Sequence, residues 1–278
     1  MTITIGAMSI QLRTDSPEFA AMLKDRYGSF IHPASNGAAF QLDIDLIPLR
    51  AVAEDDDEDI SVRLESGRWI IQRGDFRAEC DPATGRGTVR QSANPYSIDG
   101  VLRILHSLLL AREGGFLVHA ASAIRNGRAF LFAGVSGAGK TTLSRLAPPD
   151  VAVLTDEISY VRRATEPRPT EPRPTEPRPS GSGYLAFGTP FAGELARIGE
   201  NLRAPLAAVY LLAQGPENRI EPVAPAEAVR ALLRNILFFA HDEELVQLVF
   251  RAAFDFVSQV SVQRLVFTPD ARAWELIV

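Results

Sequence analysis

The stretch Gly134-Val135-Ser136-Gly137-Ala138-Gly139-Lys140-Thr141-Thr142 fits the pattern G-x-x-x-x-G-K-[ST] without a gap. This pattern is typical of the loop that binds phosphate in nucleotide-binding proteins. An apolar run at 129–133 precedes the stretch and predicts a buried strand, and residues 142–146 can begin a helix after it. Because the motif requires a strand before it and a helix after it, this context strengthens the match. We therefore predict a site for ATP or GTP, centred on this glycine-rich loop (residues 134–142).

The residue types in the loop suit phosphate binding. Glycines let the backbone turn tightly with its N–H groups pointing at the β- and γ-phosphates, and the positive end of the following helix faces the same anion. Lys140 would bring a positive charge to the phosphates, and the Thr141 hydroxyl would hold a bound Mg²⁺. A glycine-rich turn that binds nothing is the less favoured alternative, because the motif rarely falls between a strand and a helix by chance. We assign nucleotide binding to Gly134, Ser136, Gly137, Ala138, Gly139, Lys140, Thr141 and Thr142.

The composition is that of an ordinary soluble protein. The chain has 278 residues, of which 46% are hydrophobic and 23% are charged, enough for one large domain or two smaller ones. A formal net charge of −5 offers no basic surface, so we expect no nucleic-acid partner. The first residues lack the features of a signal peptide and no run approaches the roughly 18 apolar residues of a membrane span, which predicts a cytoplasmic protein without membrane contact. The single cysteine and the four histidines show no metal-ligand spacing, which leaves Mg²⁺ with the nucleotide as the expected metal.

Residues 1–96 have the pattern of a small β-rich domain. A strand is expected near residues 3–12, followed by a helix with Ser16 as its N-cap and Pro17 at its first position. Beyond these, alternating apolar residues and glycine turns predict a meander of strands. We interpret the acidic run at 54–59 as a solvated loop, in preference to a cation site.

Residues 97–278 are predicted to form the nucleotide-binding domain, of mixed α/β class. Apolar residues at helical spacing predict an amphipathic helix over 97–112. Two strands follow, at 116–124 and 129–133, and the Asn126-Gly127 pair between them is a strong signal for a β-hairpin. An antiparallel hairpin directly before the glycine-rich loop differs from the ordinary βαβ arrangement of nucleotide domains.

An apolar strand at 151–155 ends in two adjacent carboxylates, Asp156 and Glu157, which we call the acid pair. Such an arrangement places an acidic group beside the loop threonine and its Mg²⁺. One carboxylate can hold the metal while the other accepts a proton from an attacking hydroxyl. A pair of exposed turn acids without function is the alternative, and the glycine-rich loop upstream makes it less favoured.

Residues 164–183 form a proline-rich insert with three copies of the sequence TEPRP. It is predicted to be disordered, because its prolines remove backbone donors and it has nothing apolar to bury. We favour a tolerated loop expansion over a docking arm. A glycine-rich turn after the insert carries Thr189 and Glu194, which we place on the acceptor side of the pocket. The remaining predicted elements are a strand at 206–213, helices at 225–239 and 242–258, and a strand at 260–267.

Several of these segments together resemble the catalytic domain of HPr kinase/phosphorylase. The resemblance covers about residues 115–278 and rests on the hairpin, the glycine-rich loop, the acid pair and the segment Leu117-Val118-His119-Ala120. It is closer to shorter relatives encoded with lasso-peptide and other peptide-modification machinery, which phosphorylate a serine of a precursor peptide. The resemblance implies a fold similar to phosphoenolpyruvate carboxykinase, with Asp156 as the catalytic base, Glu157 and Thr141 serving Mg²⁺, and His119 near the phosphates.

Two departures from the parent family bear on the acceptor. The second acid is Glu157 where the parent enzyme has Asp, and the segment 188–194 stands where the parent has its glycine-rich signature. These differences argue against HPr itself as the acceptor and against the reverse phosphorylase reaction. The parent's N-terminal domain is not evident in this sequence.

Three functions are compatible with these features. The leading hypothesis is an ATP-dependent kinase that transfers the γ-phosphoryl group to a serine hydroxyl of a peptide or protein, with Asp156, His119 and Lys140 as its catalytic residues. A small-metabolite kinase is the second, and a nucleotide-sensing module without catalysis, in which the acid pair only holds Mg²⁺, is the third. A homo-oligomer is compatible with all three.

Overall fold

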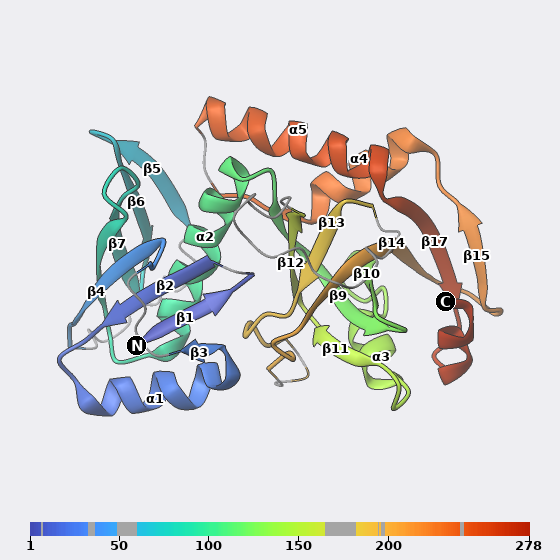
Figure 1. The fold of residues 1–278 in the computed structure, drawn as a ribbon, viewed down its shortest axis with the longest axis horizontal. Coiled ribbons are helices and arrows are strands. Elements are labelled where there is room, and N and C mark those ends of the chain that lie inside the picture. Colours follow the sequence, from blue (N-terminus) through green and yellow to red (C-terminus); the bar gives the residue numbers. More distant parts are fainter. Residues whose placement is uncertain are drawn as a thin grey trace, which may run out of the picture. The chain divides into compact units, whose positions relative to one another are not determined.

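The computed structural model describes residues 1–6, 8–32, 37–48, 60–164, 182–193, 195, 198–239 and 242–278. The chain is of mixed α/β class and divides into two compact units (Figure 1). The first unit comprises Met1–Arg112 with Leu237–Gln247, and the second comprises Glu113–Ile236 with Leu248–Val278. The acidic run at 54–59 and the TEPRP repeats lie outside the described residues.

The first unit is built on an eight-stranded sheet with the order β3-β1-β2-β4-β8-β7-β6-β5. The single strand expected near residues 3–12 is two antiparallel strands instead, because Gly6, with φ of 60°, turns the chain between them. Ser16 caps α1 as predicted, and its hydroxyl accepts a hydrogen bond from the Phe19 N–H (3.2 Å). The elements of this unit are β1 (Thr2–Ile5), β2 (Met8–Arg13), α1 (Pro17–Tyr27), η1 (Gly28–Phe30), β3 (Ile31–His32), β4 (Phe40–Leu46), β5 (Ser61–Glu65), β6 (Arg68–Arg73), β7 (Phe76–Asp81), β8 (Arg86–Gln91) and α2 (Pro95–Arg112).

Helix α2 belongs to the first unit, whereas the sequence pattern predicts it in the second. The buried carboxylate of Asp99 accepts hydrogen bonds from the Tyr27 hydroxyl (2.5 Å) and from Nε of Arg26 (3.0 Å), both at the end of α1. The Ser97 hydroxyl donates to Asp75 (2.7 Å) in the turn between β6 and β7. These bonds tie α2 to the N-terminal sheet, so the boundary expected between residues 96 and 97 lies between residues 112 and 113.

The second unit contains a closed ring of five strands. Strand β9 pairs with β10 and β12, β12 with β13, β13 with β14, and β14 returns to pair with β10. Strands β17 and β15 extend the sheet from β14. The elements of this unit are β9 (Phe116–Arg125), β10 (Arg128–Ala133), α3 (Lys140–Arg145), β11 (Ala152–Thr155), β12 (Ile158–Arg163), β13 (Tyr184–Phe187), β14 (Arg203–Gln214), β15 (Arg219–Pro222), α4 (Pro225–Asn235), β17 (Ser261–Phe267) and η2 (Ala271–Leu276). Two further elements, β16 (Ile236–Leu237) and α5 (Glu243–Gln259), have residues in both units.

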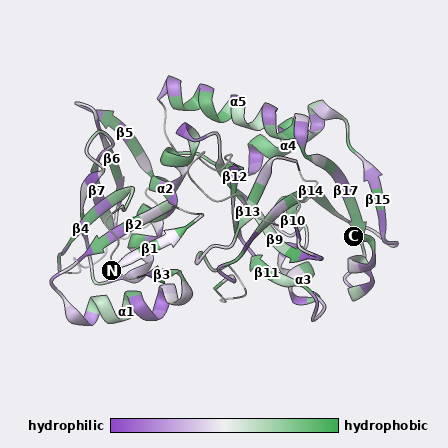
Figure 2. Cartoon of the chain, viewed as in Figure 1, coloured by the Kyte–Doolittle hydropathy of each residue, from purple (hydrophilic) through white to green (hydrophobic). Residues whose placement is uncertain are grey.

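The hairpin of β9 and β10 forms as the Asn-Gly pair predicts. Asn126 and Gly127 both have positive φ, 51° and 73°, the conformation that a two-residue hairpin turn requires. Its strands alternate between two cores, because successive side chains of a strand point to opposite faces. Leu131 packs on one face with α4 and α5, whereas Phe130 and Phe132 pack on the other with α3 and η2. Figure 2 shows the hydrophobic residues along these central strands.

His106 in α2 generates a prediction for the acid stability of the protein. The side chain is fully buried, and this burial lowers its pKa to about 3, so the folded protein keeps the imidazole neutral. The unfolded chain takes up a proton near the ordinary pKa of 6.5, so this group costs stability progressively as the pH falls from 6.5 toward 3. We expect His106→Leu to flatten the fall of unfolding free energy in that window, by up to roughly 1.4 kcal/mol per pH unit. Urea unfolding at several pH values tests this, and parallel curves for the two proteins would contradict it.

Candidate functional site

Strand β9 brings three segments of the sequence together. Its partner β10 leads directly into the glycine-rich loop, and on the opposite edge β11 and β12 flank the acid pair. The aligned residue pairs are Ala133–Ala120 for β10, Thr155–Ser122 for β11 and Ile158–His119 for β12. Because the three β9 residues in these pairs lie within positions 119–122, the loop, the acid pair and His119 meet at the middle of β9.

These segments line a single cavity of about 550 Å³. Six residues of the glycine-rich loop contribute, together with the acid pair and His119. The complete lining is His119, Ser136, Gly137, Gly139, Lys140, Thr141, Thr142, Asp156, Glu157, Ala192, Gly193 and Gln214. Of the residues we assigned to nucleotide binding, only Gly134 and Ala138 are missing from this lining. The Gly134 carbonyl accepts a hydrogen bond from Lys140, and Ala138 packs in the core beneath the loop.

Lys140 and Gly139 fix the conformation of the glycine-rich loop. The buried Lys140 ammonium donates to the carbonyls of Gly134 (2.8 Å) and Val135 (3.4 Å), which folds the loop around it. Gly139 has φ of 106°, and a Cβ there would lie 2.6 Å from the ring of Phe267. Both the backbone conformation and the contact therefore require glycine at this position.

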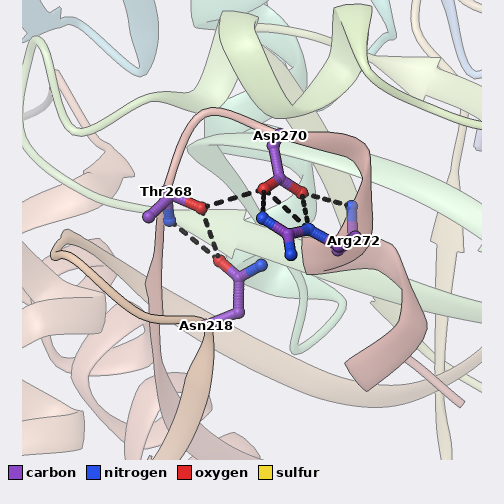
Figure 3. A network of polar contacts seen from close by, with 4 residues as sticks. All are labelled: Asn218, Thr268, Asp270 and Arg272. Carbon is purple, nitrogen blue, oxygen red and sulfur yellow. Dashed lines mark hydrogen bonds and ion pairs between the residues drawn. The ribbon is translucent and has the colours of Figure 1, made fainter.

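Two neighbouring segments support the loop, and the sequence did not indicate either of them. The Gln214 side chain, at the end of β14, donates to the Gly137 carbonyl (2.8 Å). Phe267, which contacts Gly139, is followed by a turn held by polar contacts (Figure 3). In that turn the Asn218 side chain accepts from the Thr268 N–H (2.8 Å). Hydrogen bonds from Arg272 lower the pKa of Asp270, which keeps this carboxylate charged and bound to Thr268.

The acid pair sits in a tight corner between β11 and β12. The Thr155 hydroxyl accepts hydrogen bonds from the N–H groups of Glu157 and Ile158, both at 3.2 Å, and so shapes the turn. Asp156 is 4% exposed, and its carboxylate accepts from the N–H groups of Gly193 (3.1 Å) and Leu195 (2.9 Å). The main chain after β13 therefore holds Asp156 in a defined orientation.

The structure corrects the position expected for Thr189. Its side chain is fully buried, and its hydroxyl donates to the Ile158 carbonyl (2.7 Å). Thr189 thus fastens the segment after β13 to β12 and is not presented to an acceptor. Glu194, the other residue placed on the acceptor side, lies outside the described residues.

The helix after the loop is shorter than the motif suggests. Helix α3 spans only six residues, from Lys140 to Arg145, and the indole N–H of Trp274 donates to the Leu143 carbonyl (3.1 Å) within its last turn. A short helix has a weaker macrodipole. Anion binding in this cavity would therefore depend mainly on the loop N–H groups and on Lys140.

The donor set of the cavity suits Mg²⁺ better than a transition metal. Across the described residues, no three His, Cys, Asp or Glu side chains gather as a metal site. Mg²⁺ does not need such a cluster, because it usually takes one or two carboxylates together with water and substrate phosphate oxygens. The acid pair and the Thr141 hydroxyl line the same cavity and provide hard oxygen donors of this kind.

These features define a mixed α/β protein with a lysine-containing glycine-rich loop beside two carboxylates. The model of the family described as "SynChlorMet cassette protein ScmC" matches residues 96–277, more than half of the chain, and the chain belongs to this family. The comparison with curated proteins found no match. None of the helices in the described ranges is both long and apolar enough to cross a membrane.

Gly193 generates a prediction for the geometry of the acid pair. A Cβ at this position would lie 2.8 Å from the Glu157 Cβ and 2.9 Å from an Asp156 carboxylate oxygen. We expect Gly193→Ala to destabilise the protein by about 1–3 kcal/mol, because the segment must move away from the acids. Gly74→Ala is the matched control, since a Cβ there meets nothing within 4 Å. Denaturant unfolding of both variants measures the difference, and equal effects would contradict the close packing described here.

Proposed function

We propose that this protein is a kinase that transfers the γ-phosphoryl group of ATP to a serine hydroxyl of a peptide or protein. ATP is the expected donor, with GTP as the alternative, and a precursor peptide in a pathway of the lasso-peptide type is the proposed acceptor. The proposal includes a cytoplasmic location. It also includes a catalytic domain related in fold to HPr kinase and phosphoenolpyruvate carboxykinase.

The observation that carries the proposal is the shared cavity. Lys140 and Thr141, which the motif assigns to phosphate and Mg²⁺, line the same space as Asp156, Glu157 and His119. Phosphoryl transfer needs mainly positioning and neutralisation of charge, so a phosphate-binding loop, a metal and one base are sufficient. The volume of about 550 Å³ falls within the ordinary range of small-molecule pockets.

Each of these residues has a defined task in the proposed reaction. The acceptor oxygen forms a bond to the γ-phosphorus, and the bond from that phosphorus to the bridging oxygen of ADP breaks. Asp156 takes the proton of the acceptor hydroxyl, and ADP leaves with the bonding electron pair. Lys140 and the loop N–H groups bind the phosphate oxygens, and His119 lies at the same cavity wall to contact them.

Glu157, Asp156 and Thr141 are the residues that would hold Mg²⁺. The metal would supply neutralisation of the charge on the β- and γ-phosphates. Glu157 extends beside Gly193, whereas both oxygens of Asp156 already accept backbone hydrogen bonds. We therefore assign coordination mainly to Glu157 and proton transfer to Asp156.

One observation favours a second candidate, a nucleotide sensor without catalysis. A carboxylate held by two backbone N–H groups is an ordinary way to fix a loop, and Asp156 makes both bonds in this structure. If that is its whole task, nucleotide binding would reorganise the 193–195 segment and no phosphate would be transferred. A small-metabolite kinase would use the same cavity chemistry as the peptide kinase and differ only in the acceptor.

Lys140→Ala tests the nucleotide site. The chain contains only two lysines, so Lys24, exposed on α1, provides a matched control. We expect Mg-ATP to raise the melting temperature of the parent and of Lys24→Ala but not of Lys140→Ala, because the phosphates lose their main side-chain charge. An acyl-phosphate analogue of ATP that modifies lysine should label Lys140 in preference to Lys24. An equal thermal shift in all three proteins would contradict the assignment of the glycine-rich loop to nucleotide binding.

Substitutions in the acid pair separate catalysis from sensing. Asp156→Asn removes the proton acceptor, and transfer to serine should fall by roughly 10²- to 10⁴-fold while nucleotide still binds. The amide also replaces one of two accepting oxygens, so a loss of stability of about 1–3 kcal/mol is expected beside the kinetic effect.

Glu157→Gln should instead raise the Mg²⁺ concentration required for half-maximal rate, because its proposed task is coordination. The turnover and the ATP affinity of both variants are measured across a Mg²⁺ titration and compared with those of the parent. Near-normal turnover in Asp156→Asn would exclude it as the base and would favour the sensor.

A further inference from the structure

A second cavity, of about 360 Å³, also borders Asp156. Asp156 is the one described residue that lines both cavities. The walls of the second cavity are about equally polar and apolar, and Val151, Val153 and Ile198 are among the apolar residues. A carboxylate between two cavities can reach a group in either one.

Helix α3 also connects the two cavities. Thr141 lines the first, and Ser144 and Arg145 line the second. Residues three and four apart on a helix lie on the same face, and one turn advances about 5 Å along the axis. A phosphate beside Thr141 and an occupant beside Arg145 would therefore be about one helical turn apart, with Asp156 bordering both.

The second cavity contains two charged side chains without partners among the described residues. The Arg145 guanidinium and the Glu200 carboxylate each lack a hydrogen bond or ion pair with that part of the chain, whereas Asp156 is held by two N–H groups. Both Arg145 and Glu200 are exposed, so the cavity is open to solvent where they lie. The planar fork of an arginine matches a carboxylate, with which it forms two parallel hydrogen bonds.

We propose that this second cavity binds the acceptor, and that the acceptor is a peptide whose serine reaches Asp156 while a neighbouring acidic side chain pairs with Arg145. The inference rests on the proposed kinase function and adds the acceptor's position and charge. An open cavity with both polar and apolar walls can contact the main chain and the side chains of an extended peptide. Glu200 lines the same cavity, so one acidic residue beside the serine is favoured over an acidic run.

Matched peptides test the charge preference. Three hexapeptides of the form Gly-Ala-Xaa-Ser-Ala-Gly, with Asp, Asn or Lys as Xaa, are incubated with the full chain and Mg-ATP, and a second set places Xaa after the serine. Mass spectrometry measures the added phosphate. We expect kcat/KM to be roughly tenfold higher for the Asp than for the Asn peptide in at least one set, the size of one charged hydrogen-bonded contact.

Variants of Arg145 connect that preference to the cavity. Arg145→Gln should reduce the Asp-over-Asn preference to less than roughly twofold through KM, and Arg145→Glu should favour the Lys peptide. The thermal shift with Mg-ATP should remain as in the parent. Arg230→Gln, which removes an exposed arginine of α4 that lines neither cavity, should change nothing.

The outcomes separate this inference from the proposed function. If the Asn and Asp peptides are phosphorylated equally well, or if Arg145→Gln leaves the preference unchanged, the acceptor assignment is wrong. The proposed kinase function is not affected by either result. If no peptide is phosphorylated, a binding measurement tests the cavity assignment by itself. A fluorescein-labelled Asp peptide is titrated with the protein saturated with Mg²⁺ and a non-hydrolysable ATP analogue. Binding that Arg145→Gln weakens keeps the cavity assignment, and absence of binding overturns it.

Discussion

The pairing of β9 on both of its edges is the constraint on which the candidate site depends. One edge binds β10 and therefore sets where the glycine-rich loop begins, and the other binds β11 and β12 and therefore sets where the acid pair turns. A shift of one residue in either register would turn the alternating side chains to the opposite core. Both cores are filled by the same strands, so the registers are fixed by packing as well as by hydrogen bonds.

A second constraint is the close approach of the segment after β13 to the end of β11. A Cβ on Gly188 would lie 1.8 Å from the Glu200 carbonyl oxygen, and a Cβ on Gly199 would lie 1.7 Å from the Leu154 carbonyl oxygen. The N–H groups of Thr189 and Glu200 donate to Leu154 and Val153, respectively. Glycine therefore permits main chain to lie directly on main chain. The same segment also carries the N–H groups of Gly193 and Leu195, which donate to Asp156.

The sequence predicted the local features well, because their signals are local. The β-hairpin follows from Asn126-Gly127, and the position of the cavity follows from the glycine-rich loop and the acid pair. The features that it did not predict depend on contacts between distant residues. Gln214 reaches the loop from 77 residues away, and nothing in the sequence around it marks that contact.

The predicted positions of Thr189 and of helix 97–112 were wrong because they, too, depend on contacts between distant residues. A threonine in a glycine-rich turn is equally compatible with an exposed hydroxyl and with one that donates to a buried carbonyl, as Thr189 does. The apolar face of a helix predicts that it packs, but not on which sheet. Contacts between distant residues decide that α2 packs with the N-terminal sheet, among them the pairing of Asp99 with Arg26 and Tyr27, more than 70 residues away.

The position of Asp156 links stability to the proposed chemistry. Its two backbone hydrogen bonds stabilise the carboxylate where burial alone would disfavour its charge. The same bonds occupy an acceptor position on each oxygen, so a hydroxyl proton must approach through the lone pairs that remain. One donor, Gly193, lines the first cavity and the other, Leu195, lines the second, so a small movement of either residue would change the access of its cavity to one carboxylate. If binding in the second cavity favours such a movement, an acceptor would help to prepare the base that acts on it, and occupancy of the two cavities would be coupled.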